Sequence, residues 1–267
     1  VRVEYLDNAE MNAAIAAGRI DLVFTNPAHY IQLRYGNRLS GAMATLQSLE
    51  NGQATAQLGG VIITRADSHI HKLRDIRGTR VAIPGAGATF LGGYQTQAYE
   101  LQLAGIDLPD EAKLIAVGSH DKVIHAVLAG EADVGFVRTG ILETLIREGK
   151  LQSGALRVIN PQQFPGFPFT TSTRLYPEWA FAALPKVPED IVKRVNRALL
   201  LITPDMAVAQ AMGIHGFTIP GDYQYVDQLT RALRLPPYEE ADFRMRDVWQ
   251  RYQWQILVGV LALLTIS

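Results

Sequence analysis

Two similar segments of the chain are each followed by polar residues that could bind a ligand. Residues 14–24 (AIAAGRIDLVF) and 126–136 (AVLAGEADVGF) agree at five of eleven positions. Each predicts an Ala-rich helix that ends at a glycine, followed by a short apolar strand of the kind found in parallel sheets. Ligands of α/β proteins bind beyond the carboxyl ends of strands, so the residues that follow these strands are the candidates. They are Asn26, His29 and Tyr30 after the first segment, and Arg138 and Thr139 after the second.

Arg138 is the candidate whose surroundings are most constrained by the sequence. It follows the apolar run Val134-Gly-Phe-Val, and an unpaired guanidinium at the end of a buried strand is costly. Its partner could be a bound anion, held by two parallel hydrogen bonds. The alternative is a structural carboxylate such as Glu143. We expect the partner to be the anion, whose charge Arg138 would neutralise.

The central part of the chain predicts alternating strands and helices, which indicate a parallel sheet. We expect strands at 80–83 and 114–117, followed by helices at 90–104 and 120–129. Helix N-termini expose backbone N–H groups that bind anions. Two helix N-termini and the guanidinium of Arg138 would then surround one point, which favours a small anion.

The loops that open these two helices supply further candidates. The loop 84–89 follows the first strand, and its Ala88 and Thr89 would offer a backbone amide and a hydroxyl. Ser119 is a suitable N-cap for the second helix, and His120 beside it could donate a hydrogen bond to an anion. The alternative for His120 is an exposed position in the first helical turn.

The two α/β segments predict an α/β fold of two lobes that face each other over a ligand cleft. We expect lobe 1 to be discontinuous, with residues 1–65 and 162–237, and lobe 2 to comprise residues 66–161. The chain would cross from lobe 1 to lobe 2 at 61–65. It would return through the Pro- and Gly-rich segment 161–168.

The end of the chain predicts a membrane attachment. Residues 256–264 (ILVGVLALL) contain no polar residue and follow three aromatic residues of the kind that favour the membrane interface. A span needs about 20 apolar residues, so we expect this run to be the beginning of a transmembrane helix. Residues 238–267 would then form a connecting helix and the start of the span. The alternative is a buried C-terminal helix, which would normally have a polar face.

Composition and motifs exclude several classes of protein. The 25 Lys and Arg balance 26 Asp and Glu, so we expect no nucleic-acid partner. The absence of Cys excludes disulfides, Cys-bound metals and a thiol nucleophile. His69 and His71 have no third ligand near them in the sequence, and no phosphate-binding or nucleophile motif is present, so we expect no metal, no cofactor and no enzyme activity in this chain. A hydrolase that uses His120 and Asp121 would lack a nucleophile.

Four stretches carry a resemblance to known families. VIITRADSHIHKLRDIRGTRVAIP (61–84) and VGSHDKVIHAVLAGEADVGF (117–136) resemble the central lobe of phosphonate-type periplasmic solute-binding proteins. VRTGILETL (137–145) and STRLYPEWAFAAL (172–184) are similar to the sensor domains of tetrathionate-sensor-type histidine kinases. The resemblance implies a type II periplasmic-binding-protein fold whose cleft closes on its ligand. Residues 85–94 lack the serines of the phosphonate-type anion loop, which favours a sulfur oxyanion over a phosphonate or phosphate.

Together these observations predict the periplasmic, extracytoplasmic sensor domain of an inner-membrane histidine kinase in a two-component system. It would bind a small anion between its lobes and signal by closing the cleft. Its partners would be the anion, the membrane through the C-terminal helix, a response regulator through the kinase part, and a second copy of the chain in a homodimer. The expected ligand-binding residues are Asn26, His29, Tyr30, Ala88, Thr89, His120, Arg138 and Thr139.

The alternative function is that of a solute-binding protein for an ABC transporter. Such a protein would deliver a phosphonate, a phosphate or another small anion to the transporter. A polar C-terminus in the full-length chain would favour it, whereas the apolar run at 256–264 favours the sensor.

Overall fold

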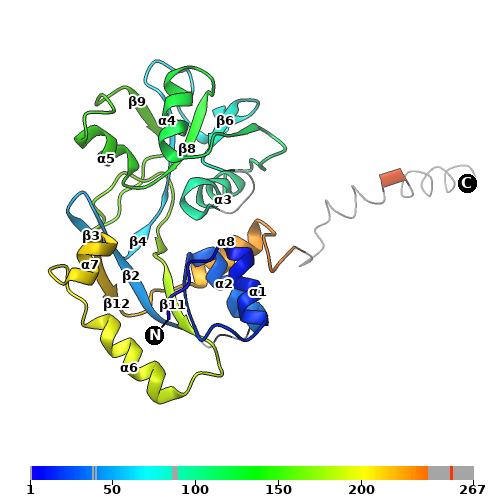
Figure 1. Cartoon of the computed structure of the whole chain (residues 1–267). Coiled ribbons are helices and arrows are strands. Elements are labelled where there is room, and N and C mark those ends of the chain that lie inside the picture. The colour runs from blue at the N-terminus through cyan, green and yellow to red at the C-terminus, as the bar shows by residue number, and fades with distance from the viewer. Residues whose placement is uncertain (1, 38, 40, 86–89, 240–252, 255–267) are drawn as a thin grey trace, which may run out of the picture.

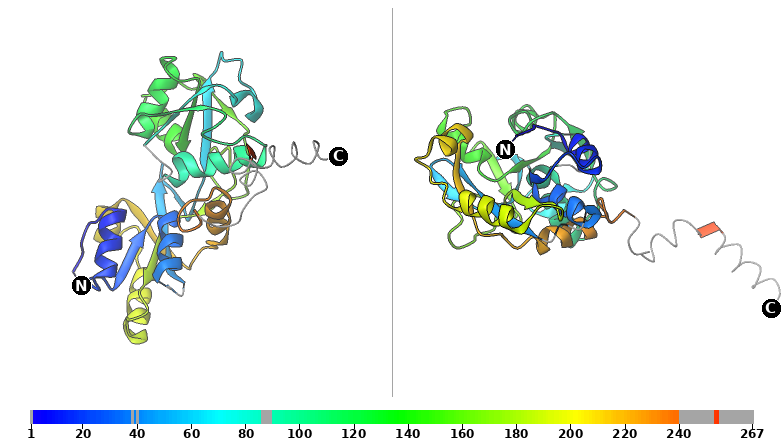
Figure 2. Two further views of the ribbon diagram at one scale, coloured as in Figure 1. Left: turned by 90° about the vertical axis from the view of Figure 1, so that its right-hand side faces the viewer. Right: turned by 60° about the horizontal axis from the view of Figure 1, so that its bottom comes forward.

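The chain folds into two α/β lobes, one above the other in Figure 1, in a computed structural model that describes residues 2–37, 39, 41–85, 90–239 and 253–254. Each lobe is built around its own β-sheet. Figure 2 shows from two further directions that the sheets are separate and that only a few extended segments pass between the lobes. The predicted two-lobed α/β architecture is therefore observed.

Lobe 1 contains a five-stranded sheet with the strand order β1-β11-β2-β12, and β3 pairs with β2. All these pairs are antiparallel, so the prediction of a parallel strand at the end of the first repeated segment is wrong. An apolar strand that is covered on both faces has the same pattern in either direction, so its sequence does not fix how it pairs. The strands are β1 (Leu22–Thr25), β2 (Ala42–Glu50), β3 (Gln53–Thr55), β11 (Ala180–Ala183) and β12 (Ile214–Thr218).

Helices cover this sheet and bury the core of lobe 1. The first of them starts with a reciprocal cap, in which Asp7 accepts from the backbone of Glu10 and Glu10 accepts from the backbone of Asp7. Tyr30, Leu33 and Leu229 are fully buried between the helices and the sheet. The helices are α1 (Asn8–Ala16), α2 (Pro27–Asn37), α6 (Glu189–Leu200), α7 (Ala207–Met212) and α8 (Gln224–Ala232).

Lobe 2 contains the second sheet, with the strand order β7-β6-β8-β5-β9. β6 is parallel to both β7 and β8, which confirms the expected parallel core, whereas β5 is antiparallel to β8 and β9. The strands are β5 (Gly60–Arg65), β6 (Arg80–Ile83), β7 (Lys113–Ala116), β8 (Val134–Arg138) and β9 (Leu156–Ile159).

The two predicted helices of lobe 2 lie close to their expected positions, and two further helical segments were not predicted. The expected helix at 90–104 is divided into a π-helical turn η2 (Leu91–Gln95) and α3 (Thr96–Leu103). A 3-10 turn η1 (Leu73–Ile76) precedes β6, and α4 (His120–Leu128) and α5 (Ile141–Arg147) follow β7 and β8.

The lobes are joined by two strands that pair with each other, β4 (Gln57–Leu58) and β10 (Tyr176–Pro177). Since β5 belongs to the sheet of lobe 2, the outward crossing lies near Gly59 and not at 61–65. The return crossing begins after Ser172, whose backbone N–H donates to the carbonyl of Gly60 at 2.8 Å. It therefore does not lie in the loop 161–168. A Cβ on Gly60 would lie 2.3 Å from Thr96 Oγ1, so this close approach of the backbone requires glycine.

The predicted membrane segment lies almost wholly outside the described residues. Tyr238 and Glu239 are not helical, Gln253 and Trp254 are, and residues 256–264 are not described. In the part of the chain that the structure describes, no helix has the length and apolar character needed to cross a bilayer.

Candidate functional site

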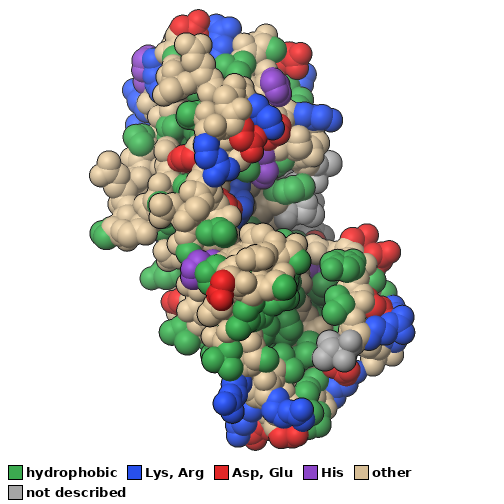
Figure 3. Space-filling view, turned by 60° about the vertical axis from the view of Figure 1, so that its left-hand side comes forward, with side chains coloured by type: hydrophobic (Ala, Val, Ile, Leu, Met, Phe, Trp, Pro, Cys, Tyr) green, Lys and Arg blue, Asp and Glu red, His purple; other side chains and the backbone are tan. Residues whose placement is uncertain are grey.

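The carboxyl ends of several strands meet at the junction of the lobes. β8 ends at Arg138, which pairs with Gly60 at the crossing, and β1 ends at Thr25, which pairs with Ala180. The space-filling view shows the molecule narrowed and hollowed between the lobes, with acidic, basic and histidine side chains gathered there (Figure 3). This junction is the candidate site.

Arg138 forms ion pairs with two carboxylates of the opposite lobe. One guanidinium nitrogen donates to Glu50 Oε1, and the other donates to Glu178 Oε1. Glu50 ends β2 and Glu178 follows β10, so this cluster joins lobe 2 to lobe 1. Burial works against the charge on Arg138, but Glu178 and Glu50 outweigh it and raise the pKa of the guanidinium.

The observed partners of Arg138 are structural carboxylates, the alternative that the sequence left open, but they are not the carboxylate that was named. In the structure both guanidinium contacts are carboxylates, and neither is Glu143, which instead accepts from the backbone N–H of Thr170 at 2.7 Å. The observed partners are 88 and 40 residues away along the chain. Contacts of such separation leave no periodic or motif signal in the sequence, so the residues near Arg138 do not indicate them.

The two carboxylates are held in different ways. Glu178 is almost completely buried, and its Oε1 also accepts from Ser48 Oγ at 3.3 Å. Glu50 is more exposed and lies against Gly140, where a Cβ would come within 1.9 Å of its Oε2. Burial raises the pKa of Glu50 even though Arg138 opposes this, and the negative charges of Glu178 and Glu143 add to the increase.

His120 faces the same region from the start of α4. Ser119 caps this helix by accepting from the backbone N–H of Lys122 at 3.3 Å. The Nδ1 atom of His120 is buried and has no hydrogen-bond partner among the described residues. Burial and the positive charge of Arg138 lower the pKa of His120 to about 4, so its ring is neutral near pH 7. A neutral imidazole can donate one hydrogen bond without adding charge.

Asn26 and His29 lie at the N-terminus of α2, on the lobe 1 side of the junction. Asn26 Oδ1 accepts from the backbone N–H of His29 at 3.0 Å, and this bond caps the helix. The His29 ring bonds Thr25 Oγ1 at 2.8 Å and Asn12 Oδ1 at 3.1 Å, and burial lowers its pKa. Both residues line a cavity of about 250 Å³, to which Gln95 contributes from lobe 2.

Of the remaining predicted residues, the structure describes Tyr30 and Thr139, and both side chains are buried. Tyr30 is buried in the core of lobe 1, with its ring 4.8 Å from that of Tyr223. Thr139 is buried at the crossing, where its Oγ1 accepts from the backbone N–H of Gly59 at 3.1 Å. Ala88 and Thr89 lie outside the described residues.

Three residues of the junction were not found from the sequence. Glu50 and Glu178 bind Arg138, and Trp179, which follows Glu178 in the chain, is 41% exposed with its ring 5.4 Å from Phe24. Glu178 and Trp179 belong to the stretch STRLYPEWAFAAL that supported the resemblance to kinase sensors. That resemblance was the signal that could have identified them as site residues.

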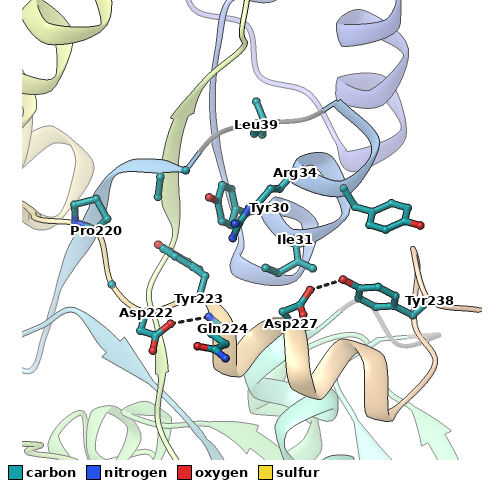
Figure 4. Close-up of a pocket in the computed structure, with 14 residues that line it drawn as sticks. Tyr30, Ile31, Arg34, Leu39, Pro220, Asp222, Tyr223, Gln224, Asp227 and Tyr238 are labelled. Atoms are coloured by element: carbon teal, nitrogen blue, oxygen red, sulfur yellow. Dashed lines mark hydrogen bonds between the residues drawn. The ribbon is translucent and has the colours of Figure 1, made fainter. Parts of the chain in front are cut away.

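A second pocket, of about 720 Å³, lies within lobe 1 between α2 and α8 (Figure 4). Tyr30 and Tyr223 form its inner wall, and Arg34 reaches toward it from α2. On its other side Tyr238 donates to Asp227 Oδ1. This pocket contains neither Arg138 nor His120, so it is separate from the junction of the lobes.

Comparisons with known proteins agree with this architecture. The sequence profile of the periplasmic substrate-binding protein of phosphonate ABC transporters matches residues 1–225. The tetrathionate sensor histidine kinase TtrS of Salmonella typhimurium is 30% identical over 269 residues, which cover 99% of this chain and 43% of the kinase. The chain therefore spans less than half of that relative.

Two solved structures show the same fold at low sequence identity. The protein XAC2383 of Xanthomonas citri, bound to ATP, has a TM-score of 0.66 at 19% identity, over 85% of this chain and 84% of that chain. PhnD1 of Prochlorococcus marinus, in complex with methylphosphonate, has a TM-score of 0.58 at 14% identity, over 87% of this chain and 85% of that chain.

Proposed function

Because the chain belongs to the family of periplasmic substrate-binding proteins of phosphonate ABC transporters, we propose that it is the extracytoplasmic ligand-sensing domain of a membrane-bound sensor histidine kinase. It binds a small oxyanion, preferably of sulfur, between its lobes. The relation to TtrS over almost the whole chain supports the sensor assignment. The kinase part would act on a response regulator, and the membrane would hold the domain through the residues that follow Tyr238.

The observation that supports this function best is the position of Arg138. Its guanidinium lies at the carboxyl end of β8, near the N-terminus of α4 and the neutral ring of His120. A cation, a helix N-terminus and an uncharged donor together suit an oxyanion with several acceptor oxygens. Asn26 approaches the same junction from lobe 1.

Signalling would use the contacts that already join the lobes. A ligand can shift an equilibrium only by binding its two conformations with different affinity. Arg138 binds Glu50 and Glu178 across the junction, so an anion that takes hold of Arg138 changes the contacts between the lobes directly. The change in lobe position would reach the C-terminal segment through α8.

The alternative is a binding protein that delivers a small anion to an ABC transporter. The phosphonate-type profile and the methylphosphonate-bound structural relative favour it. The two functions share the site and differ in the partner, so kinase activation or transport by the full-length protein would distinguish them.

Thermal unfolding with added anions tests the proposal. We would heat the purified chain with tetrathionate, thiosulfate, sulfite, sulfate, phosphate or methylphosphonate. An anion at about 100 times its dissociation constant adds ~2.7 kcal/mol of stability, which raises the melting temperature by several degrees. The increase is expected to disappear in Arg138→Ala and to persist in Arg80→Ala, whose ion pair with Asp133 lies at the outer end of the lobe 2 sheet. No increase with any anion would refute the function.

A further inference from the structure

The cluster at the lobe junction contains more negative than positive charge. One guanidinium, Arg138, is bound by the two carboxylates Glu50 and Glu178. Glu143 of α5 is close enough to Glu50 for its charge to raise the pKa of that carboxyl. An oxyanion that approaches Arg138 therefore meets like charges, and it can use the guanidinium fully only if one carboxylate leaves.

The two carboxylates differ in how easily they can leave. Glu178 has a side chain that is 1% exposed, so removing it from Arg138 would strand a buried charge, which is strongly unfavourable. Glu50 has a side chain that is 19% exposed, and it is the last residue of β2 before the turn to β3. Glu50 is therefore the carboxylate that an anion can displace.

We propose that an oxyanion binds Arg138 in exchange for Glu50, and that Glu50 takes up one proton from solvent as the exchange occurs. This inference rests on the proposed function and adds its regulation. The step balances because the O–H bond formed on Glu50 replaces an O–H bond of hydronium in the solvent, and no other covalent bond changes. The domain would then respond to its anion and to acidity together.

The groups that face Glu50 explain why it would accept the proton. Burial, Glu178 and Glu143 all raise its pKa, whereas Arg138 of β8 lowers it. When the anion takes Arg138, the group that favours the ionised form of Glu50 is lost and another negative charge arrives. Both changes raise the pKa of Glu50 further. Because the bound state holds the extra proton, anion affinity increases as the pH falls between the two pKa values of Glu50, by up to about tenfold per pH unit.

His120 is the other group that could take up the proton in place of Glu50. Burial and the charge of Arg138 lower its pKa to about 4, and an anion on Arg138 would weaken the second of these effects. The experiment must therefore assign the proton to one of the two groups.

Calorimetric titration of the whole chain tests the inference. The probes are tetrathionate, thiosulfate and sulfate, which do not take up protons themselves above about pH 4. Binding is measured from pH 5.5 to 8 in two amine buffers of different ionisation enthalpy, and the difference in heat gives the number of protons bound. We expect up to one proton to be taken up per anion bound. We also expect the affinity to fall up to about tenfold for each unit by which the pH increases.

Three variants assign the proton. Glu50→Gln keeps the shape but cannot take up a proton, so we expect tighter binding at pH 8 and no pH dependence. His120→Asn is expected to keep the proton uptake, whatever it does to affinity. Glu143→Gln is expected to keep the uptake but to move it to lower pH, because the charge of Glu143 raises the pKa of Glu50. Carboxyl-carbon NMR of the unmodified chain, with and without anion, measures the same pKa change and does not depend on any variant folding.

Each other outcome overturns the inference. Binding without proton uptake, uptake that persists in Glu50→Gln, or uptake that is lost in His120→Asn would refute the role of Glu50 and leave the proposed function intact. If none of the anions binds at any pH, the proposed function and this inference fail together.

Discussion

Arg138 has two roles that compete for the same guanidinium. In the structure it neutralises Glu178 and Glu50 of the opposite lobe, and in the proposed function it binds an anion. Removing one partner of a buried ion pair leaves the other charge uncompensated, which costs more than the pair contributes. The residue is therefore important for stability even without ligand.

Replacing Arg138 should destabilise the chain. Arg138→Ala leaves Glu178 buried without its cation, so we expect a loss of about 3 kcal/mol in the free energy of unfolding, measured with urea. Arg80→Ala breaks the more exposed ion pair with Asp133, and its expected loss is about 1 kcal/mol or less. Equal losses in the two variants would contradict the stabilising role of the cluster.

His120 should make stability depend on pH. Its pKa is about 4 in the folded chain and 6.5 in the unfolded chain, so the unfolded state binds more protons between these values. Stability should therefore rise as the pH increases from about 4 to 6.5, by up to ~3 kcal/mol from this group. Urea unfolding at several pH values measures the rise, and a His120→Asn variant with an unchanged pH profile would exclude His120 as its source.

At the scale of elements, the turn between β2 and β3 bridges the lobes. Glu50 ends β2, and the neighbouring Asn51 lies 3.4 Å from Thr144 Oγ1 of α5. Gly140, which precedes α5, has a φ of +87°, a backbone conformation that favours glycine. It also has no side chain, which leaves room for Glu50 directly against it. The glycine thus permits the contact between the end of β2 and lobe 2.

Gly140 and Gly154 have similar positive φ angles, so substituting each of them separates the cost of backbone strain from the cost of a contact with Glu50. Gly140→Ala and Gly154→Ala both place a side chain at positive φ, but only the former meets Glu50; Gly154 has open space around it. We expect each substitution to lose about 1 kcal/mol from backbone strain, and Gly140→Ala to lose ~1–2 kcal/mol more. Thermal unfolding compares them, and equal losses would show that Glu50 does not depend on Gly140.

At the scale of the whole molecule, polar contacts between described residues help to hold the lobes together. Besides the Arg138 cluster and the contact of Asn51 with Thr144, Gln102 of α3 donates to the carbonyl of Ala232 at the end of α8, at 3.3 Å. The paired strands β4 and β10 provide the covalent connection. Because the ion cluster spans the junction, it should influence how far the lobes separate.

Neutralising both carboxylates should therefore open the molecule. In the double variant Glu50→Gln and Glu178→Gln the charge attraction across the junction is lost, and we expect a larger radius of gyration by small-angle X-ray scattering. Asp133→Asn, which removes a carboxylate from the ion pair with Arg80, is the control and should leave it unchanged. An unchanged radius in the double variant would show that other contacts fix the lobes.

The sequence by itself determined the central strands and helices of lobe 2 and the presence of two lobes. Apolar periodicity, Ser119 as a cap and glycines at helix ends act within a few residues, so the strands β6 and β7 and the helix α4 were predicted within one or two residues. Arg138 and His120 were identified because each stands at the end of a recognisable element.

Only the tertiary structure decided what surrounds those residues. The pairing of Arg138 with Glu50 and Glu178, the burial of His120 Nδ1 and the antiparallel pairing of β1 all join segments that are far apart in sequence. Tyr30 and Thr139 have the residue types of ligand-binding positions, yet packing and the crossing place them in the interior. Local patterns report which face of an element is apolar, whereas the partner on that face is chosen by how the whole chain packs.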